Sequence, residues 1–600
     1  MLRSPSDRAG ARLSQRRTAG PHHPPPPCFH LLSGGIDDNL GAGRRVGVLA
    51  ACAMAALEPL RAALDACPRP PGAAPMGYGT AGFRGQAEGM EHIFLRCGAL
   101  ACLRAAKLGT TTGCMVTASH NDEPDNGVKI CESGGDMMAE AWESTAAALA
   151  NAESTDAALE IVTALAEAED FAPDAPAEVY VAMDSRPSSP RLAALVVRGV
   201  EAMGGAVHSY GLMTTPQLHH CVRVRNAARA DGGAPPPEQG YFDQLVRAYQ
   251  MVTASRSRGP VVVDCSKGVG APKLLVLAER LTEMLEIERR NVEGRVNEGC
   301  GAEHVQKGRV LPCGVDPAAD VGVRMASMDG DADRLVYFFV RPGGGLGLLD
   351  GDKIAVLFTG FIKAQLDAAG LSGAVSVGCV QTAYANGAST QYLRETLGVP
   401  VACVPTGVKH LHKKAHDFDI GVYFEANGHG TVLFGANALA AIDAAAATAA
   451  GEAATALRVL QGLSQLINQA VGDALSDLLA VEAVLSAAGP SPSGVDEWDA
   501  LYSDRPSRQL KVQVADRKVV QPEWDEQRLV EPTALQDAVD AAVVAAGEGA
   551  RGFVRPSGTE DVVRVYAEAA TEEAADALAL ALAKCIHQLA GGVGELQSAI

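Results

Sequence analysis

Residues 179–188 read Val-Tyr-Val-Ala-Met-Asp-Ser-Arg-Pro-Ser, a β-branched and aromatic run that stops at a polar loop. The same order recurs twice, where 260–264 leads into the loop 265–270 and 375–380 leads into the loop 381–387. A helix-like segment follows each loop, and this alternation predicts an α/β protein whose sheets are mixed and mostly parallel. Because ligands bind at the carboxyl ends of strands in such sheets, functional side chains are expected in these loops.

The C-terminal part of the chain follows another pattern. Residues 509–514 alternate between polar and apolar side chains, as a half-exposed strand does, and 562–567 form a second strand-like run. Thr571, followed by two glutamates, is typical of a helix start, and this helix is expected to end near Gly591. The order of these elements predicts an α+β tail. A glycine-rich segment at 342–347 is interpreted as a hairpin tip.

The length of the chain bounds the number of domains. At 600 residues about four domains are expected, since a domain usually holds roughly 150 residues. Segments rich in Gly and Pro at 232–237 and 489–494 indicate linkers. The predicted divisions are a disordered leader at 1–53, α/β domains at 54–238, 239–350 and 351–488, and an α+β domain at 496–600.

The leader differs in composition from the rest of the chain. It carries Arg3, Arg8, Arg12, Arg16 and Arg17 among Ser, Gly and Pro, and such a segment cannot build a core. It is interpreted either as an organelle transit peptide or as the product of an upstream start codon. A short helical pattern begins at Met54 and continues to residue 64. The expected location is the cytoplasm, with import into an organelle through the leader as the alternative.

Charge and cysteine content narrow the class of protein. The net charge of −20 and the isoelectric point near 5.2 argue against broad binding to nucleic acid or to anionic membranes. The sequence contains no uncharged apolar run of 18 or more residues, so no membrane span is predicted. The 14 cysteines lack paired metal spacing and a short disulfide framework, which is typical of reduced thiols in a cytosol-like compartment.

Two segments that lie far apart in the chain suit phosphoryl chemistry. Ser119 lies in the small-residue turn Thr-Ala-Ser-His-Asn at 117–121, and 329–334 reads Asp-Gly-Asp-Ala-Asp-Arg. Aspartates at alternate positions of an extended or looped backbone bring three carboxylates to one side, where a hard cation relieves their repulsion. Oxygen ligands alone suit Mg²⁺. The alternatives are a turn or capping serine, and a solvated acidic turn or Ca²⁺ loop.

Two further segments offer groups to a sugar and to a phosphate. Glu-Ala-Asn-Gly-His-Gly at 425–430 follows the apolar strand-like run 420–424 and presents polar groups suited to sugar hydroxyls. Arg-Pro-Ser-Gly-Thr at 555–559, with Arg564, offers guanidiniums, hydroxyls and backbone amides to a phosphate. A polar glycine-rich turn and a basic surface turn are the respective alternatives. The four segments together predict a sugar phosphate as the substrate.

The chain resembles the phosphoacetylglucosamine mutase family of the α-D-phosphohexomutase superfamily from about Tyr78 to Gly594. The segments that carry the resemblance occur in the family's order and are 78–84 (Tyr-Gly-Thr-Ala-Gly-Phe-Arg), 117–121, 329–334, 406–412 (Thr-Gly-Val-Lys-His-Leu-His), 425–430 and 555–559. The resemblance implies four domains around a central cleft, with each domain giving one loop to the active site.

The resemblance also implies roles for individual residues. Ser119 would carry the phosphoryl group as phosphoserine, and an oxygen on it would join Asp329, Asp331 and Asp333 around Mg²⁺. His120 would orient the phosphoryl oxygens or fix the loop. Glu425, Ala426 and Asn427 would bind the sugar. The non-reacting phosphate would be held by Arg555, Pro556, Ser557, Gly558, Thr559 and Arg564.

The assignments of Lys409, His410 and Arg84 each leave a structural role open as the alternative. Lys409 or His410 would serve as acid or base for the sugar hydroxyl, or be structural. Arg84 would approach the phosphoserine loop.

Two positions depart from the family pattern: Asp122 stands where Pro is usual, and Lys267 stands where Asn is common. Neither departure removes a group that the mechanism needs.

The implied reaction interconverts N-acetylglucosamine 6-phosphate and N-acetylglucosamine 1-phosphate through a 1,6-bisphosphate, on the route to UDP-N-acetylglucosamine. Ala-Asn-Gly at 426–428 is the version of the sugar loop that family members acting on acetamido sugars carry, whereas relatives acting on glucose or mannose phosphates have a serine there. The alternatives are a glucose or mannose phosphomutase and a non-catalytic sugar-phosphate-binding protein. A small-molecule substrate is the expected partner, and the chain is expected to be a monomer or a weak homo-oligomer.

Overall fold

The computed structural model describes residues 57–79, 82–172, 175–228, 235–253, 258–488, 494–558 and 560–595. The expected leader at 1–53 lies outside the described residues, as do 232–234 and 489–493 of the expected linkers. Helix α2 (Glu58–Asp65) overlaps the helical pattern predicted at 54–64 and ends one residue beyond it; residues 54–56 are not described. Across the described ranges, no helix combines the length and apolar character needed to cross a membrane.

The first sheet is mixed and has five strands in the order β1-β3-β2-β4-β5. The strands are β1 (Phe83–Gln86), β2 (Thr111–Val116), β3 (Asp125–Cys131), β4 (Glu178–Met183) and β5 (Ala206–Leu212). β2, β4 and β5 run parallel, whereas β3 is antiparallel to β1 and β2. The carboxyl end of β2 therefore opens into the Ser119 turn, and that of β4 into the polar loop predicted at 184–188.

Helices cover both faces of this sheet. Alternate residues of β2 and β4 pack in two separate apolar clusters, Cys114 and Val181 in one and Met115 and Tyr180 in the other. The first cluster is covered by α3 (Glu91–Leu108) and α6 (Ser189–Ala202), and the second by α7 (Thr215–Ala227). α4 (Glu143–Asn151) and α5 (Thr155–Ala168) pack beside α3 and α2. Covering on both faces explains why β2 is buried along its whole length.

The second sheet repeats the design with strand order β10-β9-β8-β6-β7. Its strands are β6 (Arg258–Asp264), β7 (Leu285–Arg290), β8 (Met325–Met328), β9 (Leu335–Val340) and β10 (Leu346–Leu349). β9 and β10 form an antiparallel hairpin in which Leu346 pairs with Val340, so the predicted hairpin tip at 342–347 is confirmed. The aspartate-rich segment 329–334 connects β8 to β9. The helices of this part are α8 (Gln239–Thr253), α9 (Gly270–Leu281) and α10 (Ala302–Gln306).

The third sheet has the order β12-β11-β13-β14, and only its last pair is antiparallel. Its strands are β11 (Val377–Thr382), β12 (Val401–Val404), β13 (Ile420–Phe424) and β14 (Gly430–Phe434). The predicted strand at 420–424 is confirmed, whereas β11 begins two residues later than the predicted 375–380. The accompanying helices are α11 (Gly351–Ala368), α12 (Gly387–Gln391), α13 (Val408–Ala415), α14 (Ala436–Ala446), α15 (Gly451–Leu466) and α16 (Ala474–Ala488).

The second and third sheets share one apolar core. The same cluster contains Val263 of β6, Val422 of β13 and Leu479 of α16. α16 is apolar around most of its circumference, and it contacts α8 and β9 as well as α11 and α15. This shared core fixes the aspartate-rich loop after β8 relative to the loop at 425–430 after β13.

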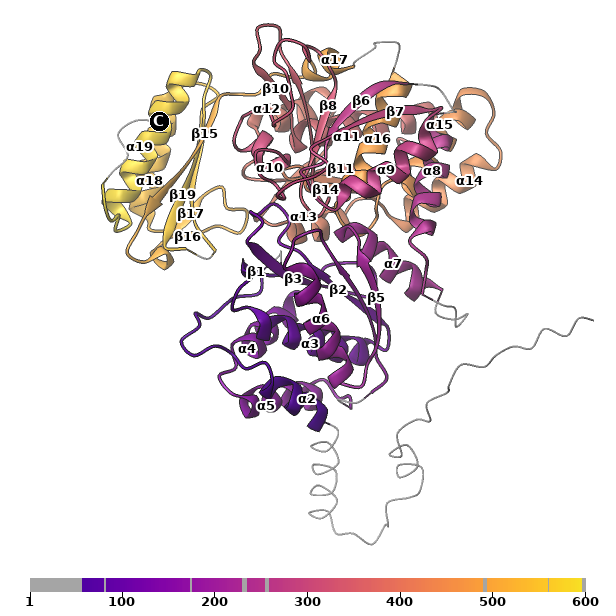
Figure 1. The fold of residues 1–600 in the computed structure, drawn as a ribbon. Coiled ribbons are helices and arrows are strands. Elements are labelled where there is room, and N and C mark those ends of the chain that lie inside the picture. Colours follow the sequence, from indigo (N-terminus) through magenta and orange to yellow (C-terminus); the bar gives the residue numbers. More distant parts are fainter. Residues whose placement is uncertain are drawn as a thin grey trace, which may run out of the picture. The chain divides into compact units, whose positions relative to one another are not determined.

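The C-terminal part is an α+β unit, as the sequence predicts. Its antiparallel sheet has the order β15-β19-β18, formed by β15 (Ser507–Gln513), β18 (Arg551–Pro556) and β19 (Val562–Glu568). Helices α18 (Thr533–Ala546) and α19 (Glu572–Leu589) pack against the sheet (Figure 1). The Thr571 hydroxyl caps α19 by accepting from the Ala574 amide. A short hairpin joins β16 (Gln521–Pro522) to β17 (Leu529–Glu531).

The predicted fold class is confirmed: three mixed α/β sheets precede an antiparallel α+β unit. The domain boundaries at 54–238, 239–350, 351–488 and 496–600 stay a prediction. The four segments singled out in the sequence lie at strand ends or in the loops that follow them, where the α/β pattern places functional side chains.

Candidate active site

Two adjoining cavities bring the predicted segments together. The smaller, of about 270 Å³, is lined by Ser119 and Asp333 among others. The larger, of about 750 Å³, is lined by Arg555 and Arg564 among others. Both cavities are bordered by Arg334, Thr406, Glu425 and Asn427. Residues from all four sheets therefore surround a continuous region that can hold a polar ligand.

Ser119 is held in an unusual conformation in the turn after β2. Its φ of +53° lies in the left-handed region, which residues other than Gly, Asn and Asp rarely adopt. The residue is 1% exposed, and its hydroxyl donates to Asp329 Oδ2 at 2.7 Å. Such backbone strain persists only where the surroundings impose it, and it clusters at functional sites. The turn therefore fixes one hydroxyl against the aspartate loop.

The aspartates of the β8–β9 loop form a buried acidic group. Asp329, Asp331 and Asp333 each offer an oxygen within 4.8 Å of the others, and all three are at most 2% exposed. Ala332, with φ of +58°, bends the loop between them. Burial and the neighbouring aspartate charges raise the pKa of Asp329 well above its ordinary value. Burial also opposes the ionisation of Asp333, but Lys129, His429 and Arg334 hold its pKa well below the ordinary value.

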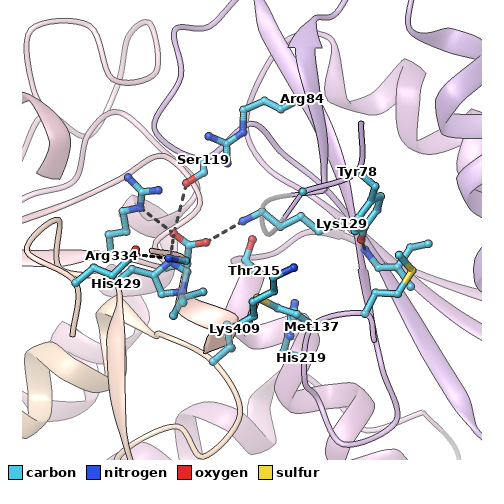
Figure 2. Close-up of a pocket in the computed structure, with 18 of the residues that line it drawn as sticks. Tyr78, Arg84, Ser119, Lys129, Met137, Thr215, His219, Arg334, Lys409 and His429 are labelled. Atoms are coloured by element: carbon cyan, nitrogen blue, oxygen red, sulfur yellow. Dashed lines mark hydrogen bonds and ion pairs between the residues drawn. The ribbon is translucent and has the colours of Figure 1, made fainter. Parts of the chain in front are cut away.

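Cationic side chains partly neutralise this group. Lys129 Nζ lies 3.0 Å from Asp331 Oδ2 and 2.8 Å from Asp333 Oδ2. Arg334 Nε lies 3.8 Å from Asp329 and 3.9 Å from Asp333. Figure 2 shows Ser119, Lys129, Arg334 and His429 directed toward one carboxylate, and the contacts identify it as Asp333. The hydroxyl of Ser119 thus lies among charges of both signs in a site with little water.

The aspartate group fits a divalent cation. Asp331 Oδ1 is buried and has no hydrogen-bond partner among the described residues, although a buried carboxylate oxygen normally has one. Thr215 and Lys129 use only the other oxygen of this carboxylate. The available donors are carboxylate and hydroxyl oxygens, the type that Mg²⁺ prefers. Within the described ranges, no other group of His, Cys, Asp or Glu meets the same distance limit.

His120 and Arg84 lie beside the serine turn. Arg84 NH1 donates to Asn121 Oδ1 at 3.0 Å and lies 3.3 Å from His120 Nε2. His120 Nε2 also contacts Glu303 Oε2 at 3.0 Å. Burial and the nearby Arg334 lower the pKa of His120 to about 4, so its ring is neutral near pH 7. Arg84 lines the cavity that contains Ser119 and therefore lies where the sequence placed it, next to the serine turn.

The sugar-loop candidates connect β13 to β14. Asn427 Oδ1 accepts from the His429 amide at 2.9 Å, and Asn427 Nδ2 donates to Glu425 Oε2 at 3.2 Å. Gly428 has φ of +85°, and a Cβ there would meet the Leu335 carbonyl oxygen at 2.0 Å. Only glycine therefore lets this loop pack against the start of β9. Glu425, Ala426 and Asn427 line the larger cavity.

The phosphate-loop candidates lie on β18, β19 and the turn between them. Arg555 and Arg564 are cross-strand partners, so their side chains share one face of the sheet, and both line the larger cavity. Arg555 and Pro556 end β18, and Ser557 is 3% exposed in the turn beside Gly558. Thr559 lies outside the described residues. Arg555 Nε and Arg564 Nε are both buried without a hydrogen-bond partner among the described residues.

The two acid/base candidates occupy different surroundings. Lys409 lines the cavity that contains Ser119, but its Nζ lies 3.0 Å from Glu143 Oε1. His410 lines neither of the two cavities described above. Burial and Lys409 lower the pKa of His410.

Several residues of the site were not singled out in the sequence. Lys129 is one, and its signal was the alternation of β3, whose Val128 and Ile130 point into the core while Lys129 points the other way. Thr215 caps the aspartate loop by donating to Asp331 Oδ2 at 2.6 Å. Arg186 and Asn297 donate to the carbonyl of Ser119 from distant loops. No local pattern could have indicated the last two contacts.

Family models match three parts of the chain. "Phosphoacetylglucosamine mutase AMG1, domain III" matches residues 350–489. "Phosphoglucomutase/phosphomannomutase, C-terminal domain" matches 510–584, and "Phosphoglucomutase/phosphomannomutase, alpha/beta/alpha domain I" matches 86–157 and 148–234. The matched ranges contain the loops at 425–430, 555–559 and 117–121.

Curated relatives match over nearly their whole length. Phosphoacetylglucosamine mutase of Sus scrofa is 46% identical over 525 residues, which is 86% of this chain and 95% of that protein. The Homo sapiens protein of the same name is 45% identical over the same span, with the same coverage. The chain belongs to the phosphoacetylglucosamine mutase family.

Solved structures of the family have the same fold. An N-acetylglucosamine-phosphate mutase in a substrate complex is 40% identical with a TM-score of 0.83, covering 88% of this chain and 99% of that one. An Aspergillus fumigatus N-acetylphosphoglucosamine mutase in complex with GlcNAc-6P and magnesium is also 40% identical, with a TM-score of 0.82 and the same coverage. The resemblance inferred from six short segments thus extends to the whole fold.

The two departures from the family pattern are both accommodated. Asp122 is exposed, and its backbone carbonyl accepts from Arg186 NH1. Lys267 has φ of +56°, and its Nζ donates to the Glu298 carbonyl at 2.9 Å. Neither side chain lines the two cavities described above.

Proposed function

We propose that this chain interconverts N-acetylglucosamine 6-phosphate and N-acetylglucosamine 1-phosphate. The observation that carries the proposal is the pairing of Ser119 Oγ with Asp329 Oδ2 at 2.7 Å, inside a buried group of three aspartates. A serine that merely capped a turn would need neither the strained backbone nor the adjacent carboxylates. The family's structures in substrate and product complexes support the same reaction.

Ser119 is the proposed phosphoryl carrier. The resting enzyme holds phosphoserine; its P–Oγ bond breaks as a P–O bond forms to O1 of the 6-phosphate, and the proton lost by O1 is balanced by protonation of Ser119 Oγ. The product of this step is the 1,6-bisphosphate. After the bisphosphate reverses its orientation in the cleft, the O6 phosphoryl group returns to Ser119 and leaves the 1-phosphate.

Asp329, Asp331 and Asp333 would hold Mg²⁺, together with an oxygen on Ser119. When bound, the ion would stabilise negative charge on the phosphoryl oxygens. The relative that contains both GlcNAc-6P and magnesium supports this assignment. Lys129 and Arg334 keep the aspartates and the transferring group close together by offsetting their mutual repulsion.

The other loops hold the rest of the substrate. Arg555, Ser557, Gly558 and Arg564 bind the phosphate that is not reacting, with Pro556 shaping the turn. Glu425 and Asn427 bind ring hydroxyls that the two orientations of the sugar present in turn. Arg84 and His120 keep the serine turn in place. Lys409, which lines the cavity with Ser119, and His410, next to it in the chain, are the proposed candidates for the acid or base that serves O1, with a structural role as the alternative.

The N-acetylated sugar is the proposed substrate rather than glucose or mannose phosphate. The support is Ala-Asn-Gly in the sugar loop together with 44–46% identity to phosphoacetylglucosamine mutases of animals, plants and a yeast. A coupled assay that compares acetylated with plain hexose phosphates tests the proposal. Equal kcat/KM values for both sugars would contradict the substrate assignment, and absence of turnover with every sugar would contradict catalysis.

We also propose a cellular setting for the reaction. The product would be supplied to the synthesis of UDP-N-acetylglucosamine in the cytoplasm, by a monomer or weak homo-oligomer. Import into an organelle through residues 1–53 is the alternative. Expression of the chain with and without residues 1–53, each fused to a fluorescent protein, distinguishes the two locations.

A further inference from the structure

We propose that Glu526 is a positioning residue that orients Arg555 for the non-reacting phosphate and couples it to the sugar-binding loop. The proposal rests on the function proposed above. Glu526 lies in the turn between β16 and β17, a segment that the sequence did not single out. The turn belongs to the C-terminal unit, whereas the groups that Glu526 contacts come from two different sheets.

The carboxylate of Glu526 divides its two oxygens between two partners. Oε1 accepts from Arg555 NH1 at 2.6 Å. Oε2 accepts from the backbone amide of Thr406 at 2.9 Å and from its hydroxyl at 2.5 Å. The side chain is only 14% exposed. Both oxygens are therefore committed in a site with restricted access to water, where charged hydrogen bonds are strong.

The backbone of Glu526 is strained to make these contacts. Its φ of +61° lies in the left-handed region, and glutamate has neither the missing Cβ nor the short polar side chain that makes this region accessible. The Glu526 amide donates to the Glu523 carbonyl at 3.0 Å, which closes the turn. Gly or Asn would satisfy the turn with less strain. A glutamate here indicates that its carboxylate is needed at this point.

The contact leaves one edge of the Arg555 guanidinium for a ligand. Arg555 NH1 donates to Glu526, and the centre of the Tyr384 ring lies 5.7 Å from the guanidinium carbon of Arg555. Nε is buried without a hydrogen-bond partner among the described residues. A phosphate binds arginine best through two parallel N–H groups of a fixed fork. The contact at NH1 thus fixes the orientation of the guanidinium of Arg555, a residue that lines the larger cavity.

The same contact continues to the sugar loop. Thr406 is followed by Gly407, whose amide donates to Glu425 Oε1 at 3.2 Å. One chain of contacts therefore runs from Arg555 through Glu526 and the 406–407 turn to Glu425. The two ends of the substrate are held by groups that share this chain, so their separation is set by the protein before the substrate arrives.

The carboxylate of Glu526 also repels a phosphate bound nearby. Whether Glu526 strengthens or weakens phosphate binding depends on whether its orientation of Arg555 outweighs this repulsion. Seven Lys and Arg residues line the cavity against four Asp and Glu residues, so its lining stays net positive with Glu526 ionised. Removing the carboxylate would free Arg555 to rotate and would leave the partly buried Thr406 amide without its charged acceptor. The orienting effect is expected to exceed the repulsion.

The first test compares Glu526→Gln with Glu523→Gln, which removes the same charge from an exposed side chain in the same turn. Loss of a charged hydrogen bond predicts that KM for the sugar 6-phosphate rises on the order of 10- to 100-fold in Glu526→Gln, with little change in kcat. The control is expected to match the wild type. An unchanged or lowered KM in Glu526→Gln would overturn the proposal.

A second test separates orientation of Arg555 from a general effect on folding. Binding of inorganic phosphate is measured by calorimetry in Glu526→Gln, in Arg555→Ala and in the double variant. If Glu526 acts through Arg555, its substitution weakens binding on its own and has no further effect once Arg555 is absent. Additive losses would overturn the proposal. Thr406→Val, which removes one donor to the same carboxylate, provides a milder variant should Glu526→Gln fold poorly, and it is expected to weaken phosphate binding in the same direction.

The phosphate titration needs no turnover, so it distinguishes this proposal from the proposed function. If the wild type lacked mutase activity but phosphate binding still depended on Glu526 through Arg555, the reaction assignment would fail and the positioning role would stand. If the enzyme were active and phosphate binding were independent of Glu526, the positioning role would fail alone.

Discussion

Arg186 NH2 donates to the backbone carbonyl of Ser119 at 2.9 Å. The same guanidinium donates to the carbonyls of Asn121, Asp122 and Asp125, and Asp184 Oδ2 accepts from its Nε at 2.9 Å. Arg186 is 1% exposed, so all of these bonds form out of water. One arginine on the loop after β4 thus holds the whole serine turn after β2, which explains how Ser119 keeps a left-handed backbone.

We predict that Arg186→Lys lowers kcat by roughly 10- to 100-fold, because lysine has no planar fork and leaves buried carbonyls without donors. Each buried carbonyl left without a donor costs about 1–3 kcal/mol. The phosphoserine content and kcat are measured together. Arg191→Lys, at an exposed site on α6 where Arg191 pairs with Glu88 and Glu91, serves as the matched control. Equal activity of the two variants would show that the turn does not depend on Arg186.

Ser119→Ala is expected to abolish mutase turnover and to leave sugar-phosphate binding largely intact, because the substitution removes the covalent carrier and not the phosphate clamp. Intact-mass measurement should detect one phosphate on the wild type and none on the variant. Steady-state activity at the wild-type level would rule out the phosphoserine mechanism.

Asp331→Asn is expected to weaken Mg²⁺ binding and to lower turnover by orders of magnitude, with partial rescue at high Mg²⁺. The amide keeps an oxygen for Thr215, so the loop should still fold. Mg²⁺ affinity is measured by calorimetry, and Asp367→Asn at an exposed helix end is the control. Full activity of the wild type in excess chelator would contradict the metal assignment.

The sequence predicted the elements that local chemistry determines. β13 spans 420–424 as expected, and the Thr571 cap starts α19. β11 starts two residues late because the Ser376 amide donates to the Asp419 carboxylate at 2.9 Å instead of entering the sheet ladder. An acceptor 43 residues away competed with the strand, and no local window contains that information.

The candidate site could be assembled from the sequence only in part. Ser119 and the aspartates were singled out because their spacing suits phosphoryl and metal chemistry, and the structure places them together. Arg186, Asn297 and Glu526 were not singled out because each contacts a backbone or side chain that only folding brings close. Asn297, for example, donates to the Ser119 carbonyl across 178 positions of the chain. Residues that position a catalytic group carry no motif of their own.

Buried neutral histidines make the stability of the fold depend on pH. His92 in α3 is 4% exposed, and burial, with Arg96 and Arg69, lowers its pKa to about 4. The unfolded chain has a histidine pKa of about 6.5, so it binds more protons than the folded state between these values. Stability from His92 is therefore present above about pH 6.5 and is lost as the pH falls toward 4.

His92→Gln is accordingly expected to flatten the pH dependence of the free energy of unfolding between pH 6.5 and 4, by up to about 1.4 kcal/mol per pH unit. Urea unfolding at several pH values measures the slope for the wild type and the variant. An identical slope in both would show that His92 does not carry this pH dependence.

Replacing Ala426 and Asn427 together by serines tests the origin of sugar selectivity. Asn427 Nδ2 donates to Glu425 Oε2 and its Oδ1 accepts from the His429 amide, so the asparagine fixes the carboxylate that is proposed to bind the sugar. Loss of one such bond costs on the order of 1–3 kcal/mol, which corresponds to roughly 5- to 150-fold in selectivity. The double substitution is expected to lower kcat/KM for N-acetylglucosamine phosphate far more than for glucose phosphate, as measured in parallel coupled assays. An equal loss for both sugars would mean that the loop contacts only the ring hydroxyls they share. In that case the acetamido group would be recognised elsewhere in the cavity that Asn427 and Glu425 border.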